Sequence, residues 1–304
     1  MRWRFRRPIN WLNTTWWSST SVNPMFTRRL RVLMHWLKGS RNNVAPGDLL
    51  RFVFSPTRAM IARRLIQSAT PLEEAGLLQV RAAGVHAPFF FPLDTPRDEV
   101  DQVLCDILKP DQWHFYEIPQ TAVRPEDVVA DCGAAEGLFT LTVAHRCRHV
   151  FAIEPAPAFV KALGRTLAGL ANVSILPYAL AESDGAVRLS AGGITSRVTD
   201  AGDGQVVPSR AIDSLFIRQG RRVDYLKADL EGAEISMLRG AIETIRACAP
   251  RIAITTYHRR EHAEQIAALL RDIHPDYHIF VKGIMPQDGR PVMLHAWMDD
   301  KLKI

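Results

Sequence analysis

Residues 128–140 read Val128-Val129-Ala130-Asp131-Cys132-Gly133-Ala134-Ala135-Glu136-Gly137-Leu138-Phe139-Thr140, and Phe151-Ala152-Ile153-Glu154-Pro155 follows downstream. Both segments contain an apolar run typical of a buried strand that ends in an acid, and the first continues through a glycine turn into a helix-like run. Glycines at such a turn allow the backbone to pass close to a ligand, where a Cβ would collide. Glu154 lies about twenty residues beyond the glycines, where nucleotide-binding units place the acid that holds a ribose. The two segments therefore predict half of a nucleotide-binding unit.

The spacing of the glycines distinguishes between two classes of ligand. Dinucleotide-binding loops carry G-x-G-x-x-G, which lets a pyrophosphate sit at a helix N-terminus. This loop instead reads Asp131-x-Gly133-x-x-x-Gly137, with Glu136 inside it. A carboxylate there would repel a pyrophosphate but would attract a cationic ligand such as S-adenosylmethionine. The loop therefore favours S-adenosylmethionine over NAD, and an NAD-type oxidoreductase is the first alternative.

Strand-like and helix-like segments alternate from about residue 111 onward. The strand-like runs are Val128–Cys132, His149–Glu154, Val173–Tyr178, Val223–Leu230 and Arg251–Tyr257, with a hairpin-like pair at Tyr277–Lys282 and Val292–Trp297. The helix-like runs are Leu138–Cys147, Ala158–Leu170, Ala233–Ala247 and Glu261–Ile273. Such alternation predicts a parallel sheet with right-handed crossovers, whose ligands bind beyond the carboxyl ends of the strands. This rule places Asp131, Glu154, Asp229 and His258 along one rim.

Composition excludes several classes of protein. The 304 residues carry a net charge of +6, but no acid precedes Asp48, whereas nine Arg or Lys residues and five of the seven tryptophans do. The rest is near neutral, so general binding to nucleic acid is not expected. The four cysteines are scattered without a C-x-x-C pair, which argues against a zinc site or a disulfide framework and fits a reducing compartment. No apolar run is long enough to span a membrane, and the basic start lacks the apolar stretch of a signal peptide. We expect a cytoplasmic protein.

Several segments together carry a family resemblance. They are Asp131-Cys-Gly-Ala-Ala-Glu-Gly-Leu-Phe-Thr, Ile153-Glu154-Pro155, Ala179-Leu180, Asp184-Gly185, Ala211-Ile212-Asp213-Ser214-Leu215 and Leu226-Lys227-Ala228-Asp229-Leu230-Glu231-Gly232-Ala233-Glu234. From roughly residue 113 to the end, the chain resembles the FkbM-type S-adenosylmethionine-dependent methyltransferases, although that family usually has Asn where Ala135 stands. The resemblance implies an α/β class I methyltransferase fold, Rossmann-like, with a mostly parallel seven-stranded sheet. It implies the strand order 3-2-1-4-5-7-6 with strand 7 antiparallel, and methylation of a hydroxyl on a sugar, glycan or specialised metabolite.

The loop and the resemblance together give the expected cofactor site and domain organisation. The predicted cofactor-binding residues are Asp131, Gly133, Ala135, Glu136, Gly137, Glu154 and Ala179. Residues 111–304 form the predicted methyltransferase domain. Residues 48–110 are predicted to be an auxiliary helical region, and residues 1–47 a basic, Trp-rich leader.

A second polar group lies where the fourth strand ends and its helix begins. Alternation places Lys227 and Asp229 on one strand face, where they either have a function or simply pair with each other. His258 follows the fifth strand, and a pKa near about 6.5 makes histidine a better base than aspartate at neutral pH. We predict Lys227, Asp229, Glu231 and His258 as catalytic residues, whereas Glu234 is interpreted equally well as a helix-start charge.

Two further interpretations concern metal binding and packing around this group. A magnesium-assisted reaction with Asp229 as a ligand is less favoured than a metal-free one, because magnesium prefers oxygen ligands and His258 would be a poor partner. No metal is therefore predicted. Trp113, His114 and Tyr116 precede the first strand and are interpreted as packing residues rather than walls of an acceptor pocket.

The leader predicts a peripheral membrane contact. Phe26, Leu30, Leu33 and Leu37 are spaced to form one apolar stripe on a helix, with basic residues and Trp36 around it. The stripe would bind the inner face of a membrane, or else pack on the catalytic domain or on a second subunit of an oligomer. A catalytically inactive binding module on the same fold is the second alternative function. No nucleic-acid partner is expected, and the acceptor is a small molecule or glycan.

Overall fold

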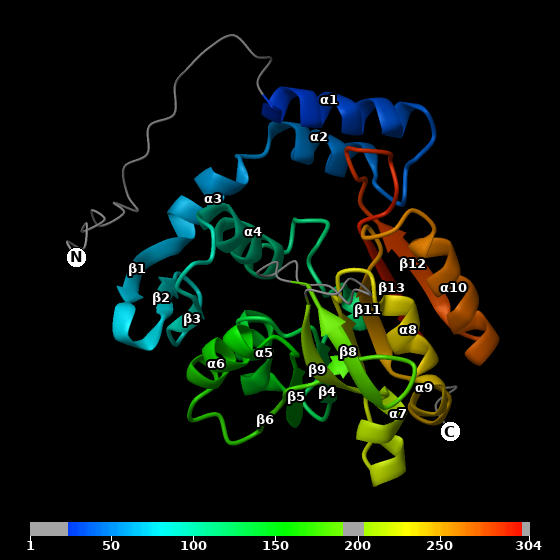
Figure 1. Ribbon diagram of the computed structural model, residues 1–304. Coiled ribbons are helices and arrows are strands. Elements are labelled where there is room, and N and C mark those ends of the chain that lie inside the picture. Colours follow the sequence, from blue (N-terminus) through cyan, green and yellow to red (C-terminus); the bar gives the residue numbers. More distant parts are fainter. Residues whose placement is uncertain (1–23, 191–203, 300–304) are drawn as a thin grey trace.

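The structure is a computed structural model that describes residues 24–190 and 204–299. Residues 1–23 of the expected leader lie outside the described residues. A seven-stranded sheet forms the centre of the molecule, with helices on both faces (Figure 1). Its strands are β4 (Val128–Cys132), β5 (His149–Ile153), β6 (Val173–Leu176), β10 (Tyr225–Ala228), β11 (Arg251–Thr255), β12 (His278–Lys282) and β13 (Met293–Trp297).

The order of the strands across this sheet is β12-β13-β11-β10-β4-β5-β6. Neighbouring strands are parallel except at β13, which runs antiparallel to both β11 and β12. In sequence order this is 6-7-5-4-1-2-3, so the predicted class I methyltransferase sheet is confirmed. The order reverses between β4 and β10, and ligands of such sheets bind beyond the strand ends at this switch point.

The helices between the strands cover the four expected runs, with two differences: a short helix at Ile212–Leu215 was not expected, and one expected helix is divided in two. They are α5 (Leu138–Val143), α6 (Pro157–Thr166), α7 (Ile212–Leu215), α8 (Glu234–Arg239), α9 (Ile242–Cys248) and α10 (His262–Ile273). The single helix expected over 233–247 is two helices, α8 and α9, separated at Gly240. A Cβ at Gly240 would overlap the backbone carbonyl of Ala181, so the chain passes close to a neighbouring segment at the break.

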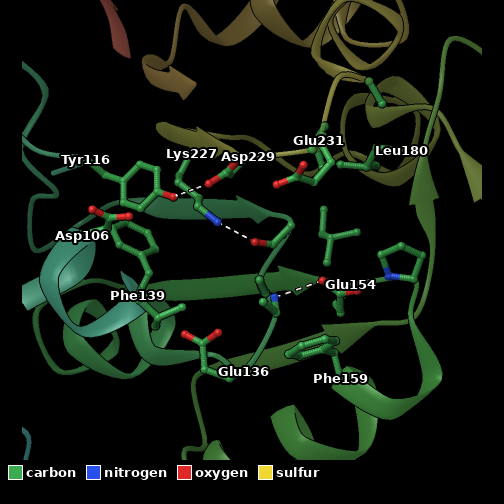
Figure 2. Close-up of a pocket in the computed structure, with 18 of the residues that line it drawn as sticks. Asp106, Tyr116, Glu136, Phe139, Glu154, Phe159, Leu180, Lys227, Asp229 and Glu231 are labelled. Carbon is green, nitrogen blue, oxygen red and sulfur yellow. Dashed lines mark hydrogen bonds between the residues drawn. The ribbon is translucent and has the colours of Figure 1, made fainter. Parts of the chain in front are cut away.

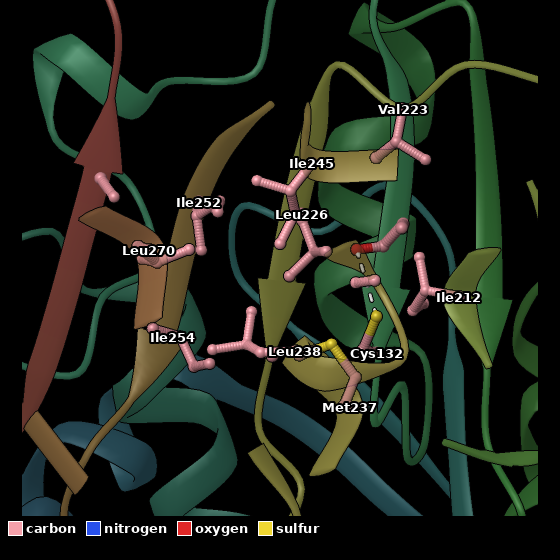
Figure 3. Close-up of a cluster of buried hydrophobic side chains, with 14 of the residues drawn as sticks. Cys132, Ile212, Val223, Leu226, Met237, Leu238, Ile245, Ile252, Ile254 and Leu270 are labelled. Carbon is pink, nitrogen blue, oxygen red and sulfur yellow. Dashed lines mark hydrogen bonds between the residues drawn. The ribbon is translucent and has the colours of Figure 1, made fainter. Parts of the chain in front are cut away.

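Side-chain alternation divides the core between the two faces of the sheet. Even-numbered residues of β4 and β10, such as Leu226, pack with α8, α9 and α10 in the largest apolar cluster (Figure 3). Odd-numbered residues such as Tyr225 face α5 on the other side. Asp131 and Lys227 are also odd-numbered, and the register pairs them directly across β4 and β10. Two charged residues therefore lie side by side on a buried face.

The region 48–110 differs from the all-helical expectation. Its helices are α2 (Pro46–Phe54), α3 (Arg58–Leu65) and α4 (Arg97–Leu108), and α1 (Pro24–Leu37) precedes them. Between α3 and α4 lies an antiparallel sheet of β1 (Ile66–Leu72), β2 (Leu77–Ala82) and β3 (Phe89–Pro92). Phe89 and Phe91 are fully buried against α4, and every residue of β3 is buried. A short strand buried on all sides has no period-two alternation, which is why the pattern did not predict it.

A third, small sheet extends the domain beside the cofactor loop. It has the order β7-β9-β8, from β7 (Ala179–Leu180), β8 (Gly185–Leu189) and β9 (Gln205–Arg210). Among the helices of the described residues, none combines the length and apolar character needed to cross a bilayer.

Candidate active site

The loop after β4 is shaped by two glycines in the left-handed region. Gly133 has φ +79°, and a Cβ there would overlap the backbone carbonyl of Asp229 after β10. Gly137 has φ +85° and precedes α5, and a Cβ there would lie 2.6 Å from the side chain of Leu163. The positive φ at both positions is strained for any residue with a Cβ. The short distances also show that the chain at Asp229 and the side chain of Leu163 pack directly on the loop. Gly137 does not line the cavity, and its role is to let α5 begin rather than to contact the cofactor.

Asp131 and Lys227 form a buried ion pair beneath this loop. Lys227 Nζ lies 2.9 Å from Asp131 Oδ1 and donates a hydrogen bond to the carbonyl oxygen of Gly133 at 2.5 Å. Asp131 Oδ2 accepts a hydrogen bond from Thr140 Oγ1 at 2.6 Å. Burial disfavours the charge on Lys227, but the carboxylates of Asp131 and Asp229 outweigh it and raise the pKa of Lys227. The pair therefore anchors the loop, and Lys227 also lines the main cavity, whereas Asp131 lies beneath it.

Glu154 lies at the end of β5 on the opposite side of the same loop (Figure 2). Its Oε2 accepts a hydrogen bond from the Ala135 amide at 3.0 Å, and its Oε1 from the Ala156 amide at 2.9 Å. The side chain lines the main cavity, and burial raises the pKa of its carboxyl group. Each oxygen has a second lone pair, so the carboxylate can still accept from a ribose hydroxyl.

Glu136 brings a second acid to the cavity. It is 2% exposed, and burial raises the pKa of its carboxyl group to about 7. Burial destabilises the ionised carboxylate of Glu136. A cationic ligand beside it would be favoured, because the cation replaces the solvation that burial removes. The same cavity is lined by Gly133, Ala135 and Ala179, which were predicted for the cofactor, and by Phe159 and Leu180.

The other wall of the cavity is built around Asp229. Tyr116 donates a hydrogen bond from its hydroxyl to Asp229 Oδ2 at 2.8 Å (Figure 2). His114 Nε2 lies 3.5 Å from the same oxygen. Thr255 Oγ1 donates to Asp229 Oδ1 at 3.1 Å. His114 Nε2 also lies 3.2 Å from the hydroxyl of Tyr257. Two hydrogen-bond donors, Tyr116 and Thr255, thus fix the carboxylate of Asp229 at the cavity surface, with His114 beside it.

His258, Glu231 and Glu234 lie next to Asp229. Imidazole Nδ1 of His258 lies 2.7 Å from Glu234 Oε1, and its Nε2 faces Glu231 Oε1 at 3.3 Å and Asp229 Oδ1 at 3.5 Å. Burial opposes a charged imidazole, but Glu231, Glu234 and Asp229 outweigh it and raise the pKa of His258 to about 10. His258 does not line the cavity, whereas Asp229 and Glu231 do. The predicted base His258 therefore lies behind Asp229 and Glu231, outside the lining of the cavity.

Sequence reasoning missed several residues of this wall. Tyr116 and His114, interpreted as packing, contact Asp229 directly, and Asp106 and Tyr257 line the same cavity. Only Trp113 packs as expected, stacked on Phe52 with ring centroids 4.4 Å apart. A Trp-His-x-Tyr segment just before a first strand carries polar atoms that a pure packing segment would not need, and this was the available indication.

A second cavity adjoins the first. The two share Gln102, Asp106, His114 and Tyr257. The second cavity is also lined by Arg28, Arg31, Arg51 and Arg58, which come from α1, α2 and α3. Asp106 and Asp111 are the acids on its wall, and Arg58 Nη2 lies 3.7 Å from Asp106 Oδ1. The lining therefore carries an excess of positive charge, which is suited to an anionic ligand.

Comparisons with known proteins place this site in a family. Residues 131–281 match the sequence profile of the methyltransferase FkbM domain. A search of curated proteins finds no match. Among solved structures, a methyltransferase FkbM from Methylobacillus flagellatus is similar at 20% identity and a TM-score of 0.47, over 66% of this chain and 55% of that one. This chain thus spans just over half the length of that protein.

Two further solved structures are similar to this chain at lower identity. TYW2 from M. jannaschii, solved in complex with AdoMet, has 13% identity and a TM-score of 0.38, over 73% of this chain and 83% of its own. An rRNA methylase from Streptococcus thermophilus has 13% identity and a TM-score of 0.37, over 58% of this chain and 89% of its own.

Proposed function

The chain belongs to the FkbM methyltransferase family, and we propose that it transfers a methyl group from S-adenosylmethionine to a hydroxyl oxygen. One observation carries the proposal. Two acids suited to a cationic nucleoside, Glu136 and Glu154, line one cavity with the carboxylate of Asp229, which two hydrogen-bond donors hold in place. The absence of a dinucleotide loop and the charge of Glu136 argue against the oxidoreductase, and the complete Asp229 wall argues against an inactive module.

The chemistry follows from this arrangement. The acceptor oxygen attacks the methyl carbon, the carbon–sulfur bond breaks as the carbon–oxygen bond forms, and S-adenosylhomocysteine leaves. The hydroxyl proton passes to the carboxylate of Asp229, which Tyr116 and His114 orient toward the cavity. Alignment of the oxygen with the sulfonium methyl supplies roughly 7–11 kcal/mol of the barrier, and a positioned base adds about 10²–10⁴-fold.

The second cavity supports a class of acceptor. Its four arginines lie beside the residues that it shares with the first cavity, so an acceptor held by its anionic group would extend its hydroxyl toward Asp229. We therefore propose a small or glycan acceptor that carries phosphate or carboxylate. Tritiated-methyl transfer into cell-extract fractions separated by anion exchange would test this, and label confined to unbound, uncharged fractions would contradict it.

The cofactor assignment is tested separately from the acceptor. S-Adenosylhomocysteine should raise the melting temperature of the purified chain, whereas NAD should not, because a ligand that binds only the folded state stabilises it. Stabilisation by NAD alone would favour the oxidoreductase.

Replacing Glu154 by Ala should weaken S-adenosylmethionine binding by about 1.5–3 kcal/mol, or roughly 10–150-fold, the usual scale of hydrogen bonds to a charged group. Calorimetry on the folded variant measures the loss. Glu126→Gln, an exposed acid elsewhere on the surface, serves as control. Unchanged affinity in Glu154→Ala would remove the ribose assignment.

Glu136→Gln should stabilise the ligand-free protein at pH 8 by about 1–3 kcal/mol, and by much less at pH 5. The pKa of Glu136 rises from 4.5 to about 7 on burial, so the folded state binds the proton more tightly than the unfolded chain. Stability from this group is therefore present below pH 4.5 and lost as the pH rises to about 7. Urea unfolding at both pH values measures the difference.

The cofactor provides an internal control for Glu136. A cation beside the ionised carboxylate offsets the cost of its burial, so S-adenosylmethionine should stabilise the wild type more than Glu136→Gln at pH 8. If Glu136→Gln is no more stable than the wild type at pH 8, or gains as much stability at pH 5 as at pH 8, then ionisation of Glu136 does not destabilise the folded protein.

A membrane-surface role is proposed for α1. Phe26 and Leu37 are 61% and 69% exposed, and Leu30 and Met34 are exposed beside them. The expected stripe is thus corrected at one position, because Leu33 packs inward, against the cluster that contains Val32 and Leu49. The helix carries Arg28, Arg29 and Arg31 and no acid, which suits the anionic inner face of a membrane.

The chain should therefore co-sediment with vesicles that contain anionic lipid, and less so at high salt. Leu30→Ser combined with Leu37→Ser should abolish pelleting, whereas Val206→Ser, which removes a 57% exposed apolar residue on β9, should not. Equal pelleting with neutral vesicles, or none with anionic ones, would leave α1 as an interface with protein.

A further inference from the structure

We propose that Asp229, Glu231 and His258 hold a divalent transition-metal cation at the wall of the active-site cavity. One ligand atom from each residue lies within 4.8 Å of the others. The existence of the site is independent of the methyl-transfer reaction, but the role given to the metal rests on the function proposed above. The sequence predicted no metal at these residues, because His258 is a poor ligand for magnesium.

The distances around His258 Nε2 fit metal coordination better than hydrogen bonding. Nε2 lies 3.3 Å from Glu231 Oε1 and 3.5 Å from Asp229 Oδ1. Ligand atoms that bind one tetrahedral cation at about 2.1 Å stand about 3.4 Å from each other. A charge-assisted hydrogen bond from an imidazolium to a carboxylate would instead be about 2.7–2.9 Å long.

The burial of the imidazole provides a second, independent observation. The side chain of His258 is only 7% exposed, and its Nε2 has no hydrogen-bond partner. Nδ1 lies 2.7 Å from Glu234 Oε1, so Nε2 is the ring nitrogen left facing the carboxylates of Asp229 and Glu231. A metal would bind there by displacing the Nε2 proton, because histidine binds metals as the neutral imidazole.

Glu234 supplies the supporting contact that metal-bound histidines usually have. Its carboxylate is fully buried and accepts hydrogen bonds at Oε1 from the backbone amides of Leu230 at 3.0 Å and Gly232 at 3.4 Å. A carboxylate that is fixed in this way holds the ring of His258 in one orientation and selects the tautomer that binds a metal through Nε2. Glu234 is therefore a positioning residue for the site.

The donor set selects the class of cation. One imidazole nitrogen with two carboxylate oxygens suits Zn²⁺, Mn²⁺ or a similar transition metal, whereas Mg²⁺ and Ca²⁺ prefer oxygen ligands alone. Asp229 and Glu231 line the cavity and His258 lies outside its lining, so the free coordination positions open toward the acceptor. A cation there would attract the acceptor hydroxyl oxygen and lower the pKa of the hydroxyl, which makes proton transfer to Asp229 easier.

Direct measurement of Mn²⁺ binding tests the site without any substrate. The full chain, stripped with chelator and dialysed, is titrated with Mn²⁺ and the free ion is followed by electron paramagnetic resonance. We expect one tightly bound ion per chain, at least 10-fold weaker binding in Glu231→Gln and His258→Gln, and 10–100-fold weaker binding in Glu234→Gln. Glu243→Gln, an exposed acid that pairs with Arg218, is the matched control and should bind as the wild type does.

Glu231→Gln is the decisive variant, because Glu231 is only partly buried and the change preserves its shape. Circular dichroism and thermal melts confirm that it is folded. Mn²⁺ bound equally by the wild type and folded Glu231→Gln, or not bound by the wild type, would overturn the site. Methyl transfer that persists in chelator without bound metal would overturn the role given to the metal and leave the methyltransferase assignment standing. Tight Mn²⁺ binding without any S-adenosylmethionine binding would support the site and refute the function.

Discussion

Asp229→Asn should lower methyl-transfer turnover by about 10²–10⁴-fold while it leaves S-adenosylmethionine affinity nearly unchanged. The amide cannot take the hydroxyl proton, but it has nearly the same shape: its oxygen can still accept from Tyr116, and its NH2 group can donate to Thr255 Oγ1. Initial rates with the acceptor measure the turnover, and calorimetry measures the cofactor affinity. The loss should appear mainly in kcat, because the contact acts on the transferred proton rather than on cofactor binding.

Tyr116→Phe distinguishes the orientation of the Asp229 carboxylate from its action as a base. It removes one of the hydrogen bonds that orient Asp229 and leaves the base itself, so its effect on turnover should be much smaller than that of Asp229→Asn. Glu243→Gln should behave as the wild type does in both measurements. Wild-type turnover in Asp229→Asn would show that Asp229 is structural and would leave His114 as the candidate base.

The architecture of the sheet could be predicted because its cause is local and repeated. The strands β4, β5, β10 and β11 are each an apolar run that ends near a polar residue, and short connections restrict the topology to few choices, whereas the small sheet of β7, β8 and β9 was not predicted. The strand β3 could not be predicted in this way, because Phe89, Phe90 and Phe91 are buried together and show no alternation. Nothing in the local pattern distinguishes such a strand from a buried turn of helix.

The sequence predicted which residues gather at the site, but not which side chains surround each of them. The strand-end rule brought Asp131, Glu154, Asp229 and His258 to one rim, and the structure places them there. A role, however, depends on what surrounds a side chain, and those neighbours come from distant segments. Tyr116 reaches Asp229 from before the first strand, and Glu234 turns His258 away from the cavity. The sequence left open that Lys227 and Asp229 simply pair with each other. Lys227 does form an ion pair, but its closest partner is Asp131.

Lys227→Met should destabilise the protein by about 3–5 kcal/mol, because it leaves the carboxylate of Asp131 buried without its cation. Asp131 is 0% exposed and would retain the hydrogen bond from Thr140. The carbonyl of Gly133 would also lose the donor that holds the cofactor loop. Urea unfolding monitored by circular dichroism measures the free energy of unfolding, with the midpoint falling at constant slope.

The double variant Lys227→Met with Asp131→Asn shows whether the cost comes from the unpaired charge. An amide at position 131 can still accept from Thr140 and carries no charge, so the double variant should recover about 1–3 kcal/mol relative to Lys227→Met alone. That gain would identify the ion pair as a structural anchor of the loop rather than part of the chemistry. Lys227→Met that unfolds like the wild type yet loses turnover as Asp229→Asn does would return Lys227 to a direct role in catalysis, since only contact with substrate or cofactor could then explain the loss.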